Sequence, residues 1–112
     1  MSHDEFAAGT VWFADLDPIR GHEQAGDRPV LIVSSAVHLA LTGGELVAVL
    51  PMTTRVRPGW LHHVQLSAGG CVMTEQVRTL ARERFRRRAP ELDPDGEERA
   101  EVRAALTRMI DL

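Results

Sequence analysis

Lysine is absent from the 112-residue sequence, so each of its 13 basic side chains is an arginine. The guanidinium group is planar and always charged, and its paired N–H groups match phosphate oxygens well. A genome rich in G and C favours arginine codons and explains the missing lysines equally well. The absence of lysine alone therefore does not decide whether the protein binds phosphate.

Cysteine occurs once, at Cys71. A single cysteine cannot form an intrachain disulfide, and it excludes a zinc site built from several cysteines. We expect Cys71 to be a small buried side chain and not a nucleophile, because no histidine and aspartate are assigned to it.

Long apolar runs are also missing, since none approaches the roughly 18 residues of a membrane-spanning helix. The acidic amino terminus, MSHDEF, lacks the features of a signal peptide. We therefore expect a cytoplasmic protein without membrane contact. Hydrophobic residues make up 44% of the chain and charged residues 26%, which is typical of one globular domain over residues 1–112.

The net charge of −3 hides a segregation of sign along the chain. Residues 1–54 carry two arginines against seven acids, residues 55–88 eight against two, and residues 89–112 three against seven. A basic middle segment is typical of a nucleic-acid-binding surface, but it would equally serve for internal pairing with the acidic ends.

Short apolar or alternating runs, separated by Gly and Pro turns, predict five strands. They are Thr10–Leu16, Val30–Val33, Leu46–Leu50, His62–Leu66 and Cys71–Val77. Such strands predict a mainly β (α+β) fold, a small antiparallel β-barrel. Arg82–Arg88 is expected to be a short helix or loop with only Phe85 to bury.

The carboxy-terminal segment predicts a helix that packs on the barrel. Asp93 is its expected N-cap and Pro94 its first residue. Apolar residues then recur at helical spacing, and these are Val102, Leu106, Met109 and Ile110.

Four sequence blocks carry a resemblance to a known family. They are VWFADLDP (11–18), GHEQAGDRP (21–29) followed by VLIVSS, LPMTTR (50–55) and EQVRTL (75–80). In this order and spacing they resemble the MazF/PemK (Kid) family of toxin endoribonucleases from type II toxin-antitoxin modules. The second block, close to the signature G-x-E-Q-x-G-x-R-P, is the most specific.

This resemblance implies an SH3-like barrel with short helices, a homodimer, and sequence-specific, metal-independent cleavage of single-stranded RNA. Such cleavage inhibits translation and growth until a cognate MazE-like antitoxin neutralises the toxin, and it needs no cofactor. We expect the runs VLIV and LVAVL to form the shared core of the dimer.

The expected chemistry centres on Arg28 and Thr53. Arg28 follows a polar loop and directly precedes a buried strand, so a rigid scaffold could hold its guanidinium against a phosphate. Composition alone would pair Arg28 with Asp27 or Glu23, but the resemblance makes it the arginine of the signature and Thr53 the catalytic threonine. His22 and Glu23, on the same loop, are candidates for the acid and base.

The segment RVRPGWLHH (55–63) combines arginines with Trp60, a mixture suited to single-stranded RNA. Trp60 is expected either to stack on a base or to cover the core of a hairpin. The further RNA-binding candidates are Gln24, Thr54, Arg55, Arg57, Glu75, Gln76 and Arg78.

One departure from the family concerns Met73. Kid carries an arginine two residues before the acid of the last block, where this chain has Met73 before Glu75. A thioether cannot stabilise negative charge, so Glu75 is expected to be a contributor at most, or a partner of Arg78 or Arg28.

No metal site is expected. His62 and His63 are neighbours on a predicted strand, where successive side chains point to opposite faces, and no cysteine or acid is expected to complete a ligand set.

Two other functions stay open at this point. One is a non-enzymatic, CcdB-like toxin of the same fold that binds DNA gyrase, and the other is a catalytically idle module that binds RNA or an antitoxin. The signature block with Thr53 favours the nuclease, since a purely binding toxin does not need it.

Overall fold

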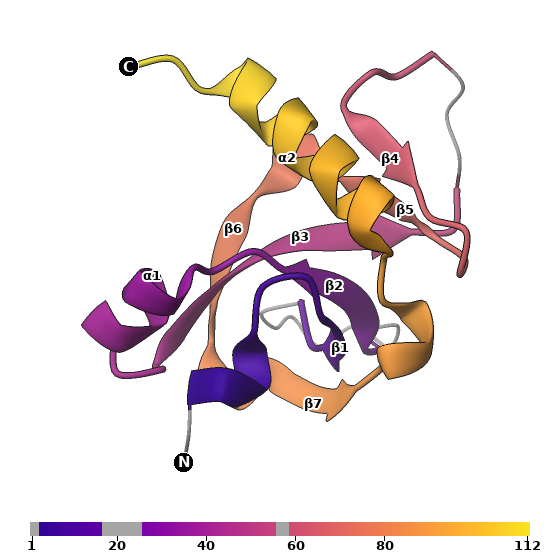
Figure 1. Ribbon diagram of the computed structural model, residues 1–112. Coiled ribbons are helices and arrows are strands. Elements are labelled where there is room, and N and C mark those ends of the chain that lie inside the picture. Colours follow the sequence, from indigo (N-terminus) through magenta and orange to yellow (C-terminus); the bar gives the residue numbers. More distant parts are fainter. Residues whose placement is uncertain (1–2, 17–25, 56–58) are drawn as a thin grey trace.

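A computed structural model describes residues 3–16, 26–55 and 59–112. Its described strands form one antiparallel sheet in the order β4-β5-β3-β2-β1-β7, with β6 also paired to β3 (Figure 1). The strands are β1 Val11–Ala14, β2 Arg28–Ile32, β3 Leu46–Thr53, β4 His63–Gln65, β5 Cys71–Met73, β6 Arg78–Ala81 and β7 Phe85–Arg88. The α-helices are α1 Ala36–Leu41 and α2 Gly96–Met109, and the 3-10 turns are η1 His3–Phe6, η2 Thr74–Gln76, η3 Arg82–Arg84 and η4 Pro90–Leu92.

The mainly β class with short helices and a carboxy-terminal helix is confirmed, although the pairings among the described strands do not close the sheet into a complete barrel. Each of the five predicted runs overlaps one strand, although β2 begins at Arg28, before its run, and β3 continues to Thr53, beyond its run. The fifth run divides, because only its first three residues form β5 and the chain then turns through η2.

Strand β3 joins the two halves of the sheet. Its first four residues pair with β6, in the register Leu46 to Ala81, while Met52 and Thr53 pair with β5. The opposite edge of β3 pairs with β2, where Val30 lies across from Pro51. The end of β3 is therefore held between β2 on one side and β5 on the other.

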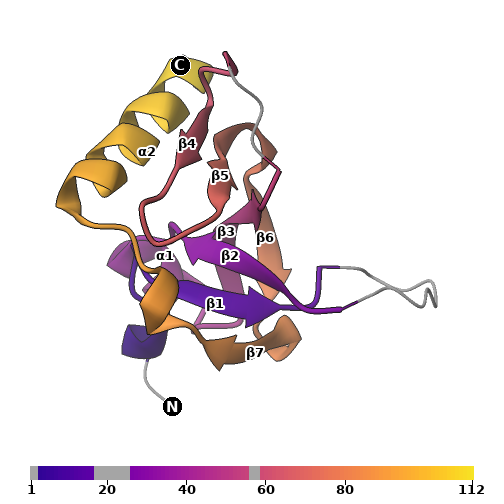
Figure 2. The ribbon, with the colours of Figure 1, turned by 90° about the vertical axis from the view of Figure 1, so that its right-hand side faces the viewer.

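Both faces of the central strands are buried, which explains their uninterrupted apolar sequences. Leu31 and Leu50 pack with residues of α2 on one face, while Val30 and Val47 pack with Phe6 and Leu39, from η1 and α1, on the other. Figure 2 shows α2 beside the β4–β5 hairpin. The runs VLIV and LVAVL thus fill the core of one chain, and the prediction that they form the shared core of a dimer is wrong.

The carboxy-terminal helix begins later than predicted. Its N-cap is Asp95, whose carboxylate accepts a hydrogen bond from the backbone N–H of Glu98, while the Glu98 carboxylate accepts from the backbone N–H of Asp95. The predicted packing is correct for Val102 and Leu106. The predicted packing is wrong for Met109 and Ile110. Both residues are exposed, because the helix ends at Met109.

The arginine-rich segment 82–88 forms a 3-10 turn and then strand β7, so the prediction of a helix or loop is only partly correct. Phe85 packs against Phe6 and Trp12, with ring centroids 4.8 Å and 6.0 Å away. The arginines pair with acids from the rest of the chain, and the pairs are Arg82–Glu5, Arg84–Asp15, Arg86–Asp15, Arg86–Asp27, Arg87–Glu91 and Arg88–Asp93. Much of the basic charge in this segment is therefore compensated inside the fold.

Neither helix in the described part of the chain has the length and apolar character needed to cross a membrane.

Candidate functional site

Strand pairing brings Arg28 and Thr53 together. Arg28 is the first residue of β2 and Thr53 the last residue of β3. The antiparallel register sets Val30 across from Pro51, and continuing it by two residues sets Arg28 across from Thr53. Both residues line the same depressions on the surface. The two residues on which the expected chemistry rests are thus neighbours, 25 positions apart in sequence.

The hydroxyl of Thr53 is oriented by the turn that follows the strand. Its Oγ1 accepts a hydrogen bond from the backbone N–H of Arg55, at 3.1 Å. This bond uses a lone pair and leaves the O–H free to donate to another group. The side chain is half-buried, so a bound molecule can reach it from the depression.

Two adjoining depressions share Arg28, Thr53, Met73 and Gln76. The first extends toward Arg78 and Leu16. The second holds four more of the predicted residues and one histidine, and these are Thr54, Arg55, Trp60, Glu75 and His63. The structure therefore gathers every described residue of the predicted site around the ends of β2 and β3.

The arginines of these depressions differ from those of segment 82–88 in their partners. Within residues 3–16, 26–55 and 59–112, no carboxylate forms an ion pair with Arg28, Arg55 or Arg78. Asp27, the acid that sequence alone would pair with Arg28, lies 3.6 Å from Arg86 instead. As far as the described residues go, the guanidinium groups at the depressions are thus available to an external anion, whereas the arginines of segment 82–88 are paired within the chain.

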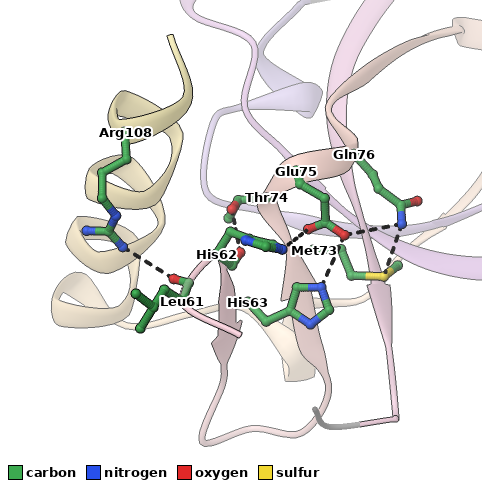
Figure 3. A network of polar contacts seen from close by, with 8 residues as sticks. All are labelled: Leu61, His62, His63, Met73, Thr74, Glu75, Gln76 and Arg108. Carbon is green, nitrogen blue, oxygen red and sulfur yellow. Dashed lines mark hydrogen bonds and ion pairs between the residues drawn. The ribbon is translucent and has the colours of Figure 1, made fainter. Parts of the chain in front are cut away.

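Glu75 is the centre of a polar network beside the depressions (Figure 3). Its Oε2 lies 3.2 Å from Nε2 of His63 and 3.3 Å from Nε2 of Gln76. Its Oε1 lies 3.8 Å from Nε2 of His62. An ionised carboxylate only accepts hydrogen bonds, so the His63 ring donates through Nε2.

Burial raises the pKa of Glu75, but hydrogen bonds from His63, its own backbone and Gln76, with the charge interaction of His63, outweigh this effect and leave the pKa below its ordinary value. Glu75 is therefore ionised at neutral pH. It does not pair with Arg28 or Arg78, the partners considered from sequence, within the described part of the chain.

His62 and His63 were predicted to point to opposite faces of a strand, and this prediction is wrong. Strand β4 begins only at His63, so the strict alternation does not extend to His62. Both imidazoles reach the carboxylate of Glu75, which η2 carries to them, and the three ligand atoms lie within 4.8 Å of one another. The geometric argument against a metal site thus fails, since an acid does join the two histidines.

The sequence carried a signal for this arrangement in the Gly69-Gly70 turn. This turn closes the β4–β5 hairpin and sets His63 across from Met73, two residues before Glu75. Continuing this register beyond Met73 toward Glu75 would have predicted that the His63 imidazole lies near the Glu75 carboxylate.

Trp60 does not cover the hydrophobic core. Its side chain is 42% exposed, and its ring lies 5.1 Å from the rings of both His62 and His63. Trp60 therefore forms part of the wall of the second depression, with an accessible ring surface.

Four predicted site residues lie outside the described residues. They are His22, Glu23, Gln24 and Arg57. Cys71 is buried as expected, and burial, reinforced by the negative charge of Glu75, raises the pKa of its thiol, which therefore stays protonated.

Comparison with known proteins identifies the family. Residues 7–110 match the family model described as PemK-like, MazF-like toxin of type II toxin-antitoxin system. Endoribonuclease EndoA of Bacillus subtilis (strain 168) is 30% identical over 95 residues, which are 78% of this chain and 80% of that protein.

Solved structures agree with this assignment. The crystal structure of MazE-MazF (Form-II) from Deinococcus radiodurans is 32% identical, with a TM-score of 0.74 over 92% of this chain and 93% of that one. The Mycobacterium tuberculosis toxin MazF-mt6, 22% identical with a TM-score of 0.71 over 92% of this chain and 99% of that one, shares the fold. The family and the endoribonuclease class expected from the sequence are confirmed, which also disfavours the gyrase-binding alternative. The chain thus belongs to the PemK-like, MazF-like toxins of type II toxin-antitoxin systems.

Proposed function

We propose that this chain cleaves single-stranded RNA at the depression between Arg28 and Thr53, by attack of the ribose 2′-hydroxyl and without a metal ion. An arginine without a carboxylate partner among residues 3–16, 26–55 and 59–112, placed beside an oriented hydroxyl, carries this proposal. A phosphate placed there would receive two hydrogen bonds from the guanidinium fork and one from Thr53.

In the reaction the 2′-oxygen loses its proton and attacks phosphorus, and the bond from phosphorus to the 5′-oxygen breaks. The 5′-oxygen takes up a proton, so the products are a 2′,3′-cyclic phosphate and a 5′-hydroxyl. Arg28 and Thr53 would stabilise the negative charge that grows on the non-bridging oxygens. His22 and Glu23 remain our proposed acid and base.

The RNA on either side of the scissile phosphate would follow the two depressions. Arg55 and Arg78 are exposed there and can contact phosphates, and the exposed part of the Trp60 ring suits a stacked base. Further contacts are proposed for the remaining residues of the set, namely Gln24, Thr54, Arg57, Glu75 and Gln76.

RNA cleavage is expected to persist in EDTA and to leave cyclic phosphate and 5′-hydroxyl ends, because the proposed groups supply all the charge stabilisation. Purified protein should be incubated with a synthetic single-stranded RNA in EDTA, and the ends identified by mass spectrometry. Loss of activity in EDTA, with recovery on adding a divalent ion, would contradict metal independence.

RNA affinity is expected to fall steeply with salt. Each phosphate contact to a single strand releases about 0.7 counterions, so three to five contacts give a slope of log affinity on log salt of roughly −2 to −3.5. The slope should be measured by fluorescence anisotropy with Thr53→Ala protein, which limits cleavage. Arg55→Gln should flatten the slope by about 0.7. Arg87→Gln should leave the slope unchanged, because Arg87 is paired with Glu91 within the chain.

We also propose a MazE-like antitoxin as a partner, as in the solved MazE-MazF complex. A homodimer and a cytoplasmic location, both expected from the sequence analysis, complete the proposal. An acidic antitoxin segment would match the arginines of the depressions and compete with RNA for them.

A further inference from the structure

The trio His62, His63 and Glu75 has the donor chemistry and the spacing of a metal site. On a tetrahedral zinc ion, imidazole nitrogens and carboxylate oxygens lie about 2.0–2.2 Å from the metal, so neighbouring ligand atoms are about 3.3 Å apart. Here Oε2 of Glu75 lies 3.2 Å from Nε2 of His63 and Oε1 lies 3.8 Å from Nε2 of His62, and one ligand atom from each of the three residues lies within 4.8 Å of the other two. Side-chain movements that bring these atoms to about 3.3 Å from one another would enclose an ion.

A second observation also indicates a missing ligand at this site. The Oε1 atom of Glu75 is buried and, among the described residues, forms no hydrogen bond. It lies on the side of the carboxylate that faces His62 (Figure 3). A buried carboxylate oxygen without a hydrogen bond is costly, and a cation between it and the two imidazoles would satisfy it.

The backbone around the trio is well held. The backbone carbonyl of His62 accepts hydrogen bonds from the hydroxyl and the N–H of Thr74, a residue that is fully buried. Arg108 of α2 donates to the carbonyl of Leu61, at 3.3 Å. The two segments that carry the ligands are thus held to each other and to the helix, so the backbone that carries the ligands is positioned before an ion arrives.

We propose that His62, His63 and Glu75 bind one zinc ion per chain, and that this ion inhibits RNA cleavage. Two imidazoles with one carboxylate suit zinc, while magnesium prefers oxygen ligands. The inhibitory part rests on the proposed function. Because His63 and Glu75 share a depression with Arg28 and Thr53, zinc at its open fourth position would hold an RNA phosphate away from these two residues.

Zinc binding should be measured first, on EDTA-treated and desalted full-length protein, by competition with a chromogenic zinc chelator. We expect one tight site per chain that excess Mg²⁺ does not displace. Co²⁺ at the same site should give the intense visible absorption of a tetrahedral complex and quench the fluorescence of Trp60, which adjoins both imidazoles.

The variants His62→Gln and Glu75→Gln should each weaken zinc binding by at least about 10- to 100-fold, since loss of an outer-shell partner alone has an effect of this size. His38→Gln is the matched control, because His38 lies on α1 and contacts Ser34. No tight zinc binding by the folded wild type, or equal binding by wild type and His62→Gln, would overturn the proposal.

Inhibition is tested separately, by comparing the rate of each protein in zinc with its own rate in EDTA. At a zinc concentration just sufficient to saturate the wild type, zinc should slow the wild type and the His38→Gln protein and leave His62→Gln largely unaffected. An active nuclease that binds zinc without slowing would overturn the inhibitory part. An inactive protein that still binds zinc at the trio would contradict the proposed function and leave the metal site standing.

Discussion

Arg28→Ala and Thr53→Ala are each expected to lower the rate of RNA cleavage by about 100-fold or more. In the proposed mechanism each variant removes a donor directed at the oxygens on which charge develops, and loss of one such donor has this effect in other enzymes. Because the charge is greatest in the transition state, we expect kcat to fall more than KM rises. Initial rates on a labelled single-stranded RNA measure both.

Arg28→Lys separates the charge of this residue from its geometry. Lysine keeps the positive charge but cannot donate two parallel hydrogen bonds to a phosphate, so it should recover only part of the lost rate. Arg103→Ala and Thr107→Ala are matched controls on the exposed part of α2, and they should keep full activity. If Arg28→Ala and Thr53→Ala are folded and fully active, the assigned site is wrong.

Asp93→Asn is expected to lower the free energy of unfolding by about 1.5 to 3 kcal/mol at pH 7, the range for hydrogen bonds to a charged group. Both carboxylate oxygens accept from Arg88, at 2.8 Å each, and Oδ1 also accepts from the backbone N–H of Val11, at 2.9 Å. Asp93 therefore ties the start of β1 to the end of β7, and denaturant unfolding measures the loss.

The same residue should make stability depend on pH. Burial raises the pKa of Asp93, but the hydrogen bonds from Arg88 and Val11, with the charges of Arg88 and Arg99, leave the pKa below its ordinary value. Its contribution is thus present above the unfolded pKa of about 3.9 and is lost as pH falls through the folded pKa.

The difference between wild type and Asp93→Asn should accordingly shrink as pH drops below about 4. Glu91→Gln is the control, since Glu91 pairs with Arg87 on the exposed surface and its loss should cost less than about 1 kcal/mol at any pH. A difference that stays constant down to pH 2 would contradict the role given to Asp93.

The strands could be predicted where both faces are buried. The runs at Val30–Val33 and Leu46–Leu50 are continuously apolar because they pack against η1 and α1 on one side and α2 on the other. Strand β7 could not be predicted in this way, because its sequence, FRRR, carries almost no apolar pattern. Its place depends on pairing with β1 and on ion pairs with acids outside the strand, which are Arg86 with the distant Asp15 and Arg88 with Asp93.

The helix start shows a similar limit. Asp93-Pro94 and Asp95-Gly96 both carry an acid before a possible first turn, and local sequence favoured the first pair. Arg88 and the backbone N–H of Val11 engage Asp93, which leaves Asp95 to cap the helix. A tertiary contact thus decided between two locally acceptable caps.

The sequence by itself determined the family, the mainly β class and the pairing of Arg28 with Thr53 in one expected site, because motifs and apolar runs are local properties of the chain. Only the tertiary structure decided which arginines pair with acids and which face the depressions, since that depends on acids that the fold brings from the amino-terminal and carboxy-terminal parts of the chain. It also decided that His62, His63 and Glu75 converge. Strand β4 begins at His63, one residue after the predicted start, and η2 follows β5, so the three side chains meet at one point.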